Sequence, residues 1–90
     1  MTTYTWDEAK RQYNLRKHGL DFADAHAVFD WHAFTYEDTR YHYSERRYIT
    51  LGYLQGVEVS IAHTEDSYGI RIISFRKASR REKRILLAAQ

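Results

Sequence analysis

The side chains best suited to chemistry gather near the end of the chain, between Tyr68 and Arg84, where the sequence reads YGIRIISFRKASRREKR. Arginine carries a planar fork of N–H donors that matches phosphate oxygens, and lysine adds a compact charge. Residues 68–90 carry seven basic groups and one acidic group, whereas residues 21–67 carry three and nine. Such a basic stripe is the usual footprint for nucleic-acid phosphate, although a run of charge is also typical of a solvated helix face.

Length and composition limit what can position these groups. Ninety residues, 43% hydrophobic and 29% charged, predict one folded domain, residues 1–90, with a modest core. The absence of cysteine excludes disulfides, thiolate metal sites and a cysteine nucleophile. The chain opens with no basic stretch followed by an apolar one, and no apolar run is long enough to span a membrane. We therefore expect a cytoplasmic protein without membrane contact.

Two helices are predicted in the first third of the chain. Thr5 or Asp7 can cap the first, and Gly19 ends it in a left-handed conformation. Asp21 opens the second. The apolar positions at helical spacing are Trp6, Ala9 and Tyr13 in the first helix and Phe22, Ala25, Val28 and Phe29 in the second.

From residue 34 onward the apolar period changes to two, which predicts strands over 34–38, 47–53, 57–63 and 70–76. Gln55-Gly56 turns the middle pair into a hairpin, and residues 40–45 form a polar loop. Ser79 and Glu82 have the spacing of a capping box, so a C-terminal helix begins there. We predict an α+β domain with two N-terminal helices, an antiparallel sheet of three to four strands and a C-terminal helix.

Spaced residues along the chain also resemble a known family. The string W-D-x-x-K-x-x-x-N-x-x-K-H-G, from Trp6 to Gly19, is similar to the opening signature of the BrnT-type toxins, and IRIIS-x-R-x-A, from Ile70 to Ala78, is similar to their most recognisable block. The shorter matches are Phe22, Ala25, Val28 and Phe29, then Glu45-Arg46, Ile49-x-x-Gly52, His63-Thr64, Arg81 and Glu82. Several blocks in order over residues 6–82 coincide by chance far less often than one motif.

The resemblance implies a ribonuclease toxin with a RelE-like fold that inhibits translation and growth. It also implies RNA as substrate and a cognate BrnA-like antitoxin that neutralises the toxin and represses their shared operon. Operator DNA would then be contacted only through the antitoxin. The chain departs from the family pattern at Asp30-Trp31-His32, where many relatives have Asp-Pro, and in its tail LLAAQ, which lacks the usual late tyrosine.

Metal-independent RNA cleavage needs a base for the 2′-OH proton, cations for the charge on the phosphate and a proton donor for the leaving 5′ oxygen. His18 and His63 lie in matched blocks and titrate near neutral pH, so either could be base or acid, and Glu45 is a weaker alternative. Each histidine could equally be structural: His18 at a helix end, His63 at the rim of the core.

Arg46, Arg71 and Arg76 are the expected stabilisers, because a strand aims a guanidinium more rigidly than a loop does. Arg76 is preferred, since it lies nearer the basic helix. Strand alternation puts Arg71 on the face opposite Arg76 unless a bulge re-aims one of them. An ion pair with an acidic residue of the neighbouring strand is an alternative role for Arg71.

The remaining basic side chains are expected to bind flanking phosphates without base specificity; they are Lys17, Lys77, Arg80, Arg81 and Arg84. Tyr41, Tyr43 and Tyr68, in predicted loops, could stack on unpaired bases. No metal-binding spacing or phosphate loop occurs, so no metal site and no cofactor are expected. A different class of function stays open, because a non-catalytic nucleic-acid- or protein-binding module would have the same electrostatics.

Overall fold

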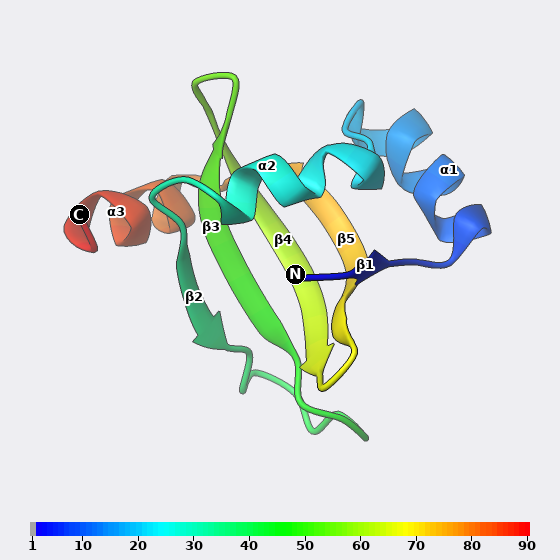
Figure 1. Cartoon of the computed structure of the whole chain (residues 1–90). Coiled ribbons are helices and arrows are strands. Elements are labelled where there is room, and N and C mark those ends of the chain that lie inside the picture. Colours follow the sequence, from blue (N-terminus) through cyan, green and yellow to red (C-terminus); the bar gives the residue numbers. More distant parts are fainter. Residues whose placement is uncertain (1) are drawn as a thin grey trace.

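One five-stranded sheet carries the fold, with helices on both of its faces (Figure 1). A computed structural model of the chain describes residues 2–90. The elements in chain order are β1 (Tyr4–Thr5), α1 (Glu8–His18), the 3₁₀ turn η1 (Phe22–Asp24), α2 (Ala25–Phe29), β2 (Phe34–Glu37), β3 (Tyr48–Leu54), β4 (Val57–Asp66), β5 (Gly69–Lys77) and α3 (Arg80–Ala88). The strands lie in the spatial order β1-β5-β4-β3-β2. No helix within residues 2–90 combines the length and apolar character that crossing a membrane requires.

The predicted α+β class and C-terminal helix are confirmed, but other details differ. The sheet is mixed and five-stranded, because β1 adds at its edge and runs parallel to β5, with Tyr4 opposite Ile70. A strand of two residues has no periodicity by which a sequence could reveal it. The second predicted helix begins as the 3₁₀ turn η1, and α2 itself has five residues.

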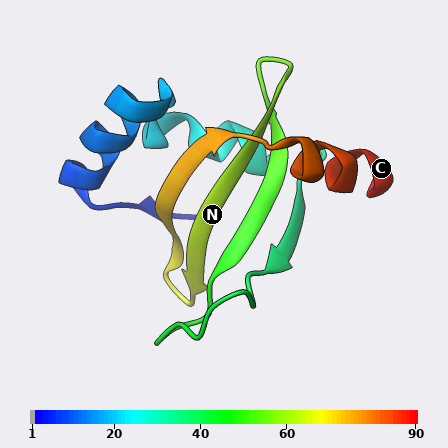
Figure 2. The ribbon, with the colours of Figure 1, turned by 180° about the vertical axis from the view of Figure 1, so that it is seen from behind.

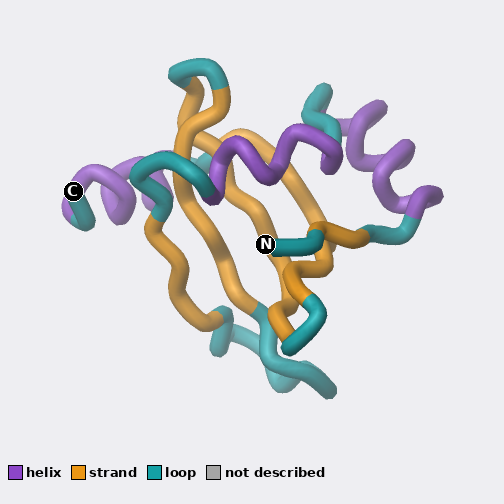
Figure 3. Tube along the Cα trace, viewed as in Figure 1, coloured by secondary structure: helices purple, strands orange, loops and turns teal. Residues whose placement is uncertain are grey.

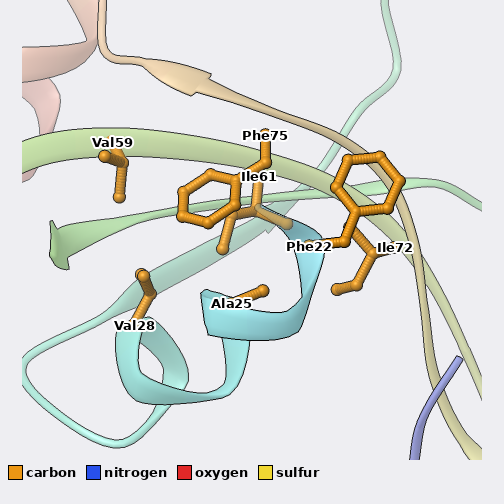
Figure 4. Packing of buried hydrophobic residues seen from close by; sticks show 7 residues of the cluster. All are labelled: Phe22, Ala25, Val28, Val59, Ile61, Ile72 and Phe75. Carbon is orange, nitrogen blue, oxygen red and sulfur yellow. The ribbon is translucent and has the colours of Figure 1, made fainter. Parts of the chain in front are cut away.

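The face of the sheet beneath α2, here called the α2 face, holds the larger apolar cluster (Figure 4). α2 approaches β3 so closely that a Cβ on Gly52 would lie 2.7 Å from Cγ1 of Val28, so a glycine suits this position. The helical spacing correctly predicted the residues that η1 and α2 contribute. The buried members of the cluster are Phe22, Ala25, Val28, Val59, Ile61, Ile72 and Phe75.

The opposite face, here called the α3 face, carries a smaller cluster. Leu86 of α3 packs against Ile49 and Leu51 of β3, and all three side chains are buried. α3 has nine residues and lies towards one end of the sheet, so it leaves much of this face uncovered (Figure 2). The α3 face is therefore divided between core and open surface.

Helix α1 protects the outer edge of β5 through one polar side chain. The Asn14 amide donates to the carbonyl oxygen of Phe75 at 2.7 Å and accepts from its N–H at 3.1 Å, as a neighbouring strand would. Asn14 is the buried residue of α1, whereas Tyr13 is 57% exposed. The predicted apolar face of this helix was therefore wrong at Ala9 and Tyr13, which are both exposed, because α1 meets a strand edge whose backbone groups need polar partners.

His63 is fully buried on the α2 face. Its Nε2 lies 2.7 Å from Oγ1 of Thr50, and its ring stacks on Tyr48 and meets Phe29 edge-on. Its Nδ1 has no hydrogen-bond partner within residues 2–90 and lies 3.7 Å from Oε1 of Glu65. Burial lowers the pKa of His63 to about 4, so the ring is neutral at pH 7.

Replacing Asn14 by alanine should lower the free energy of unfolding by about 2–3 kcal/mol, because the buried N–H and C=O of Phe75 lose their partners. Urea denaturation measures this loss. Arg16→Ala is the matched control, since it changes an exposed side chain of the same helix and should cost below about 0.5 kcal/mol. Equal losses in the two variants would contradict the role given to Asn14.

The stability of the protein should fall as the pH drops from 6.5 towards 4. In this window the unfolded chain protonates His63, whose ordinary pKa is 6.5, whereas the folded chain does not. The linked loss approaches about 3 kcal/mol at its lower end. Urea unfolding at several pH values tests this. The His63→Gln variant, which can still hydrogen-bond Thr50, should lack this pH dependence, and an unchanged slope in that variant would refute the assignment.

Candidate active site

Arg71 and Arg76 project from the same face of the sheet, although simple alternation puts them on opposite faces. Ile73 is an extra residue in the β4–β5 pairing, a β-bulge that shifts the alternation of β5 by one. Both arginines therefore lie opposite β4 residues that alternate with the buried Ile61 and His63, so both belong to the α3 face. The register pairs are Thr64 with Arg71, His63 with Ile72, Ala62 with Ser74 and Ser60 with Arg76.

Arg76 is held by a buried carboxylate at the start of α3. Its Nη1 and Nη2 donate to the two carboxylate oxygens of Glu82 at 2.7 and 3.0 Å, which is a bidentate pair. Glu82 also accepts from Oγ of Ser60 at 3.0 Å and from the backbone N–H of Ser79 at 2.8 Å. In return, Oγ of Ser79 accepts from the backbone N–H of Glu82, which completes the predicted capping box. One side chain thus joins β4, β5 and α3.

The charge of this network stays fixed at neutral pH. Burial alone would raise the pKa of Glu82, but hydrogen bonds from Arg76, the Ser79 backbone and Ser60 lower it to about 2. The Arg76 side chain is 35% exposed and Glu82 is 9% exposed, so solvent reaches the guanidinium and not its anchor. The Nε–H of Arg76 forms no hydrogen bond within residues 2–90 and can still donate to a phosphate oxygen.

His18, at the C-terminal end of α1, lies close enough to Arg76 for the two side chains to interact electrostatically. Partial burial, the charge of Lys17 and then the charge of Arg76 lower the pKa of His18 below 6.5. The imidazole is therefore neutral at pH 7 and can accept a proton. An exposed guanidinium and a neutral imidazole are thus electrostatically coupled in this part of the structure.

The other end of the open face is marked by an exposed ion pair. Nη2 of Arg71 donates to Oε1 of Glu45 at 2.8 Å, and the two side chains are 52% and 47% exposed. Glu45 belongs to the β2–β3 loop, not to a strand, so the predicted alternative of an ion pair from Arg71 is correct in kind although its partner lies elsewhere. Arg46, predicted on a strand, lies beside Glu45 in the same loop and is exposed.

The remaining predicted residues divide between the two faces. Lys77 pairs in register with Val59 and so lies on the α2 face, away from Arg76. His63 is buried on the same α2 face, so the structure does not bring it together with His18. The arginines on the first turns of α3 are exposed and form no ion pair within residues 2–90; they are Arg80, Arg81 and Arg84.

Sequence reasoning missed part of this surface. A hollow of about 260 Å³ beside Glu82 is lined by Tyr36 of β2 and by Arg40 and Arg81. Burial, followed by the nearby charge of Glu82, raises the pKa of Tyr36, so its phenol stays protonated at neutral pH. The sequence signal for Ser60 was available, because a serine between Val59 and Ile61 must face away from the α2 core.

The chain is similar to known proteins in both sequence and fold. A family model described as the ribonuclease toxin BrnT of type II toxin–antitoxin systems matches residues 6–82. The crystal structure of the ribonuclease toxin BrnT from Brucella abortus has a TM-score of 0.71 and 32% sequence identity, and the similarity covers 89% of this chain and 100% of that one. No curated protein matches the chain significantly. Because the family model spans most of the residues, this chain belongs to the BrnT family of ribonuclease toxins of type II toxin–antitoxin systems.

Proposed function

We propose that this chain is an endoribonuclease that cleaves cellular RNA in the cytoplasm at the open part of the α3 face, without a metal ion. The observation that carries the proposal is the Arg76–Glu82–Ser60 network, which holds a solvent-accessible guanidinium rigidly. His18, at the end of α1, lies within electrostatic reach of this guanidinium, and its lowered pKa keeps the imidazole neutral at pH 7. Arg71 lies farther along the same face and can bind a neighbouring phosphate.

In the proposed reaction the ribose 2′ oxygen attacks the adjacent phosphorus, and His18 takes the 2′-OH proton as general base. Arg76 stabilises the negative charge that builds on the phosphate oxygens. The bond from the 2′ oxygen to phosphorus forms, and the bond from phosphorus to the 5′ oxygen breaks. The 5′ oxygen leaves with a proton from solvent, so the products are a 2′,3′-cyclic phosphate and a 5′-hydroxyl. His63 has a structural role in this proposal, since its ring is fully buried.

RNA is bound electrostatically by the exposed arginines at the start of α3 and by Lys17, which precedes His18 in α1; the arginines are Arg80, Arg81 and Arg84. These charges neutralise flanking phosphates and carry no base preference. A BrnA-like antitoxin with an acidic segment would cover the same arginines and exclude RNA by charge complementarity. Cleavage of cellular RNA would inhibit translation and growth until the antitoxin binds, and the toxin would meet operator DNA only through that antitoxin.

Replacing Arg76 by alanine should reduce RNA cleavage by roughly 100- to 1000-fold, because the charge on the reacting phosphate loses its main stabiliser. Purified protein, a labelled single-stranded RNA and a chelator measure the rate and the metal dependence together. Lys10→Ala, which removes an exposed charge from the first half of α1, should cleave normally. Intact RNA with the unaltered chain, loss of its cleavage on chelation, or full activity of the Arg76→Ala variant would refute the proposal.

Replacing Glu82 by glutamine should lower kcat by roughly 10- to 100-fold with little change in KM, because Arg76 loses its charged anchor. Glutamine can still serve the capping box, so α3 should remain folded. Ser79→Ala is the matched control: it costs about 1 kcal/mol of stability through the cap but keeps the Arg76–Glu82 pair. In the Arg76→Ala background Glu82→Gln should reduce cleavage no further, and additive losses would contradict a role through Arg76.

A further inference from the structure

The loop between β2 and β3, residues 38–47, is braced although it contains no regular secondary structure (Figure 3). The Asp38 side chain is 4% exposed and accepts from Nε and Nη2 of Arg40 at 2.8 and 2.9 Å. It also accepts from the Arg40 backbone N–H and from the phenol of Tyr43. The hydrogen bonds from Arg40 outweigh burial and hold the pKa of Asp38 far below its usual range. The loop is thus anchored on one carboxylate at all physiological pH values.

Tyr41 and Tyr43, two of the tyrosines predicted to stack on bases, both lie in this loop but differ in their contacts. The ring of Tyr43 has the Arg47 guanidinium 4.3 Å from its centroid, and its hydroxyl bonds Asp38. Tyr43 is therefore occupied by the brace. Tyr41 meets Tyr43 at an interplanar angle of 72° and has the Arg40 guanidinium 5.7 Å from its ring centroid, yet it is itself 68% exposed. The brace thus orders an aromatic ring that remains open to solvent.

The exposed ring lines a hollow that is linked to the proposed catalytic face by an ion pair. Tyr41, His42 and Arg46 line an open hollow of about 320 Å³. Glu45 lines the same hollow and pairs with Arg71 of β5 at 2.8 Å. Arg46 is exposed and forms no ion pair within residues 2–90. The hollow therefore offers an aromatic ring and a free guanidinium beside the arginine that would hold a neighbouring phosphate.

We infer that this hollow is a subsite for one unpaired nucleobase of single-stranded RNA, with Tyr41 as the stacking platform and Arg46 on the adjoining phosphate. The inference rests on the proposed ribonuclease function. Base–aromatic stacking accepts any base, because every base has a π face. A pre-ordered ring loses little conformational entropy on binding, and this is what the Asp38 brace provides. The subsite therefore selects for unpaired RNA over duplex, in which bases cannot leave the stack without cost.

The test measures the dissociation constant of a short fluorescent single-stranded RNA by anisotropy, in the His18→Ala background, which should bind RNA without cleaving it. Tyr41→Ala should raise Kd by roughly 5- to 100-fold, and Tyr41→Phe should leave it nearly unchanged, because the aromatic face is retained. Trp31→Ala is the matched control, since Trp31 is an aromatic side chain, 58% exposed, in the loop between α2 and β2, and its loss should not affect binding. The salt dependence of binding should be the same with Tyr41 and with alanine, because no phosphate contact is lost.

A second RNA of the same length, in which abasic sites replace the bases, separates stacking from a general disturbance. With this RNA the Tyr41→Ala change should have no effect. An equal loss on both RNAs, or no loss on either, would overturn the subsite. Cleavage assays on the chain with His18 intact distinguish the two proposals: normal cleavage with no Tyr41 effect overturns the subsite alone, whereas absence of both cleavage and binding by the unaltered chain overturns both.

Discussion

The carboxylate of Glu82 is the constraint on which the candidate site depends. It is nearly buried, so it requires partners for its charge, and it finds them on three different elements: Arg76 of β5, Ser60 of β4 and the first turn of α3. Removing water from an ion pair costs energy, and the bidentate geometry with further hydrogen bonds compensates that cost here. The same bonds that set where α3 begins therefore also set the direction of the Arg76 guanidinium.

The two faces of the sheet differ because the helices cover them to different extents: one is a core face and the other is partly open. η1 and α2 cover the α2 face, where His63 and Thr50 are satisfied internally amid the apolar cluster. α3 covers only the part of the opposite face around Ile49 and Leu51. The polar and basic residues of β4 and β5 are left on the uncovered part. A short α3 leaves this part open for the proposed RNA substrate, and the second core is correspondingly small.

Strand β5 contributes residues to both faces, and the backbone groups of both its edges have hydrogen-bond partners. β4 binds one edge, while β1 and then the Asn14 amide of α1 complete the other. The bulge at Ile73 lets this strand bury Ile72 and Phe75 on one face while it presents Arg71 and Arg76 on the other. A regular strand with this sequence would send one of the two arginines to the α2 face.

The sequence by itself determined the features that rest on local chemistry. The left-handed end of α1 at Gly19, the turn at Gln55-Gly56, the capping box of α3 and the apolar face of Phe22, Ala25 and Val28 all follow from short-range spacing, and each agrees with the structure. The family assignment likewise followed from spaced residues over 6–82. What only the tertiary structure decided was the pairing of distant groups. Asn14 with Phe75, the parallel β1, the bulge and the Ser60–Glu82–Arg76 contacts join residues whose separation in the chain leaves no periodic trace. Because a bulge changes the face of every residue beyond it, the partnership of Arg71 and Arg76 could not be read from alternation, and it appeared only when β4 and β5 were paired.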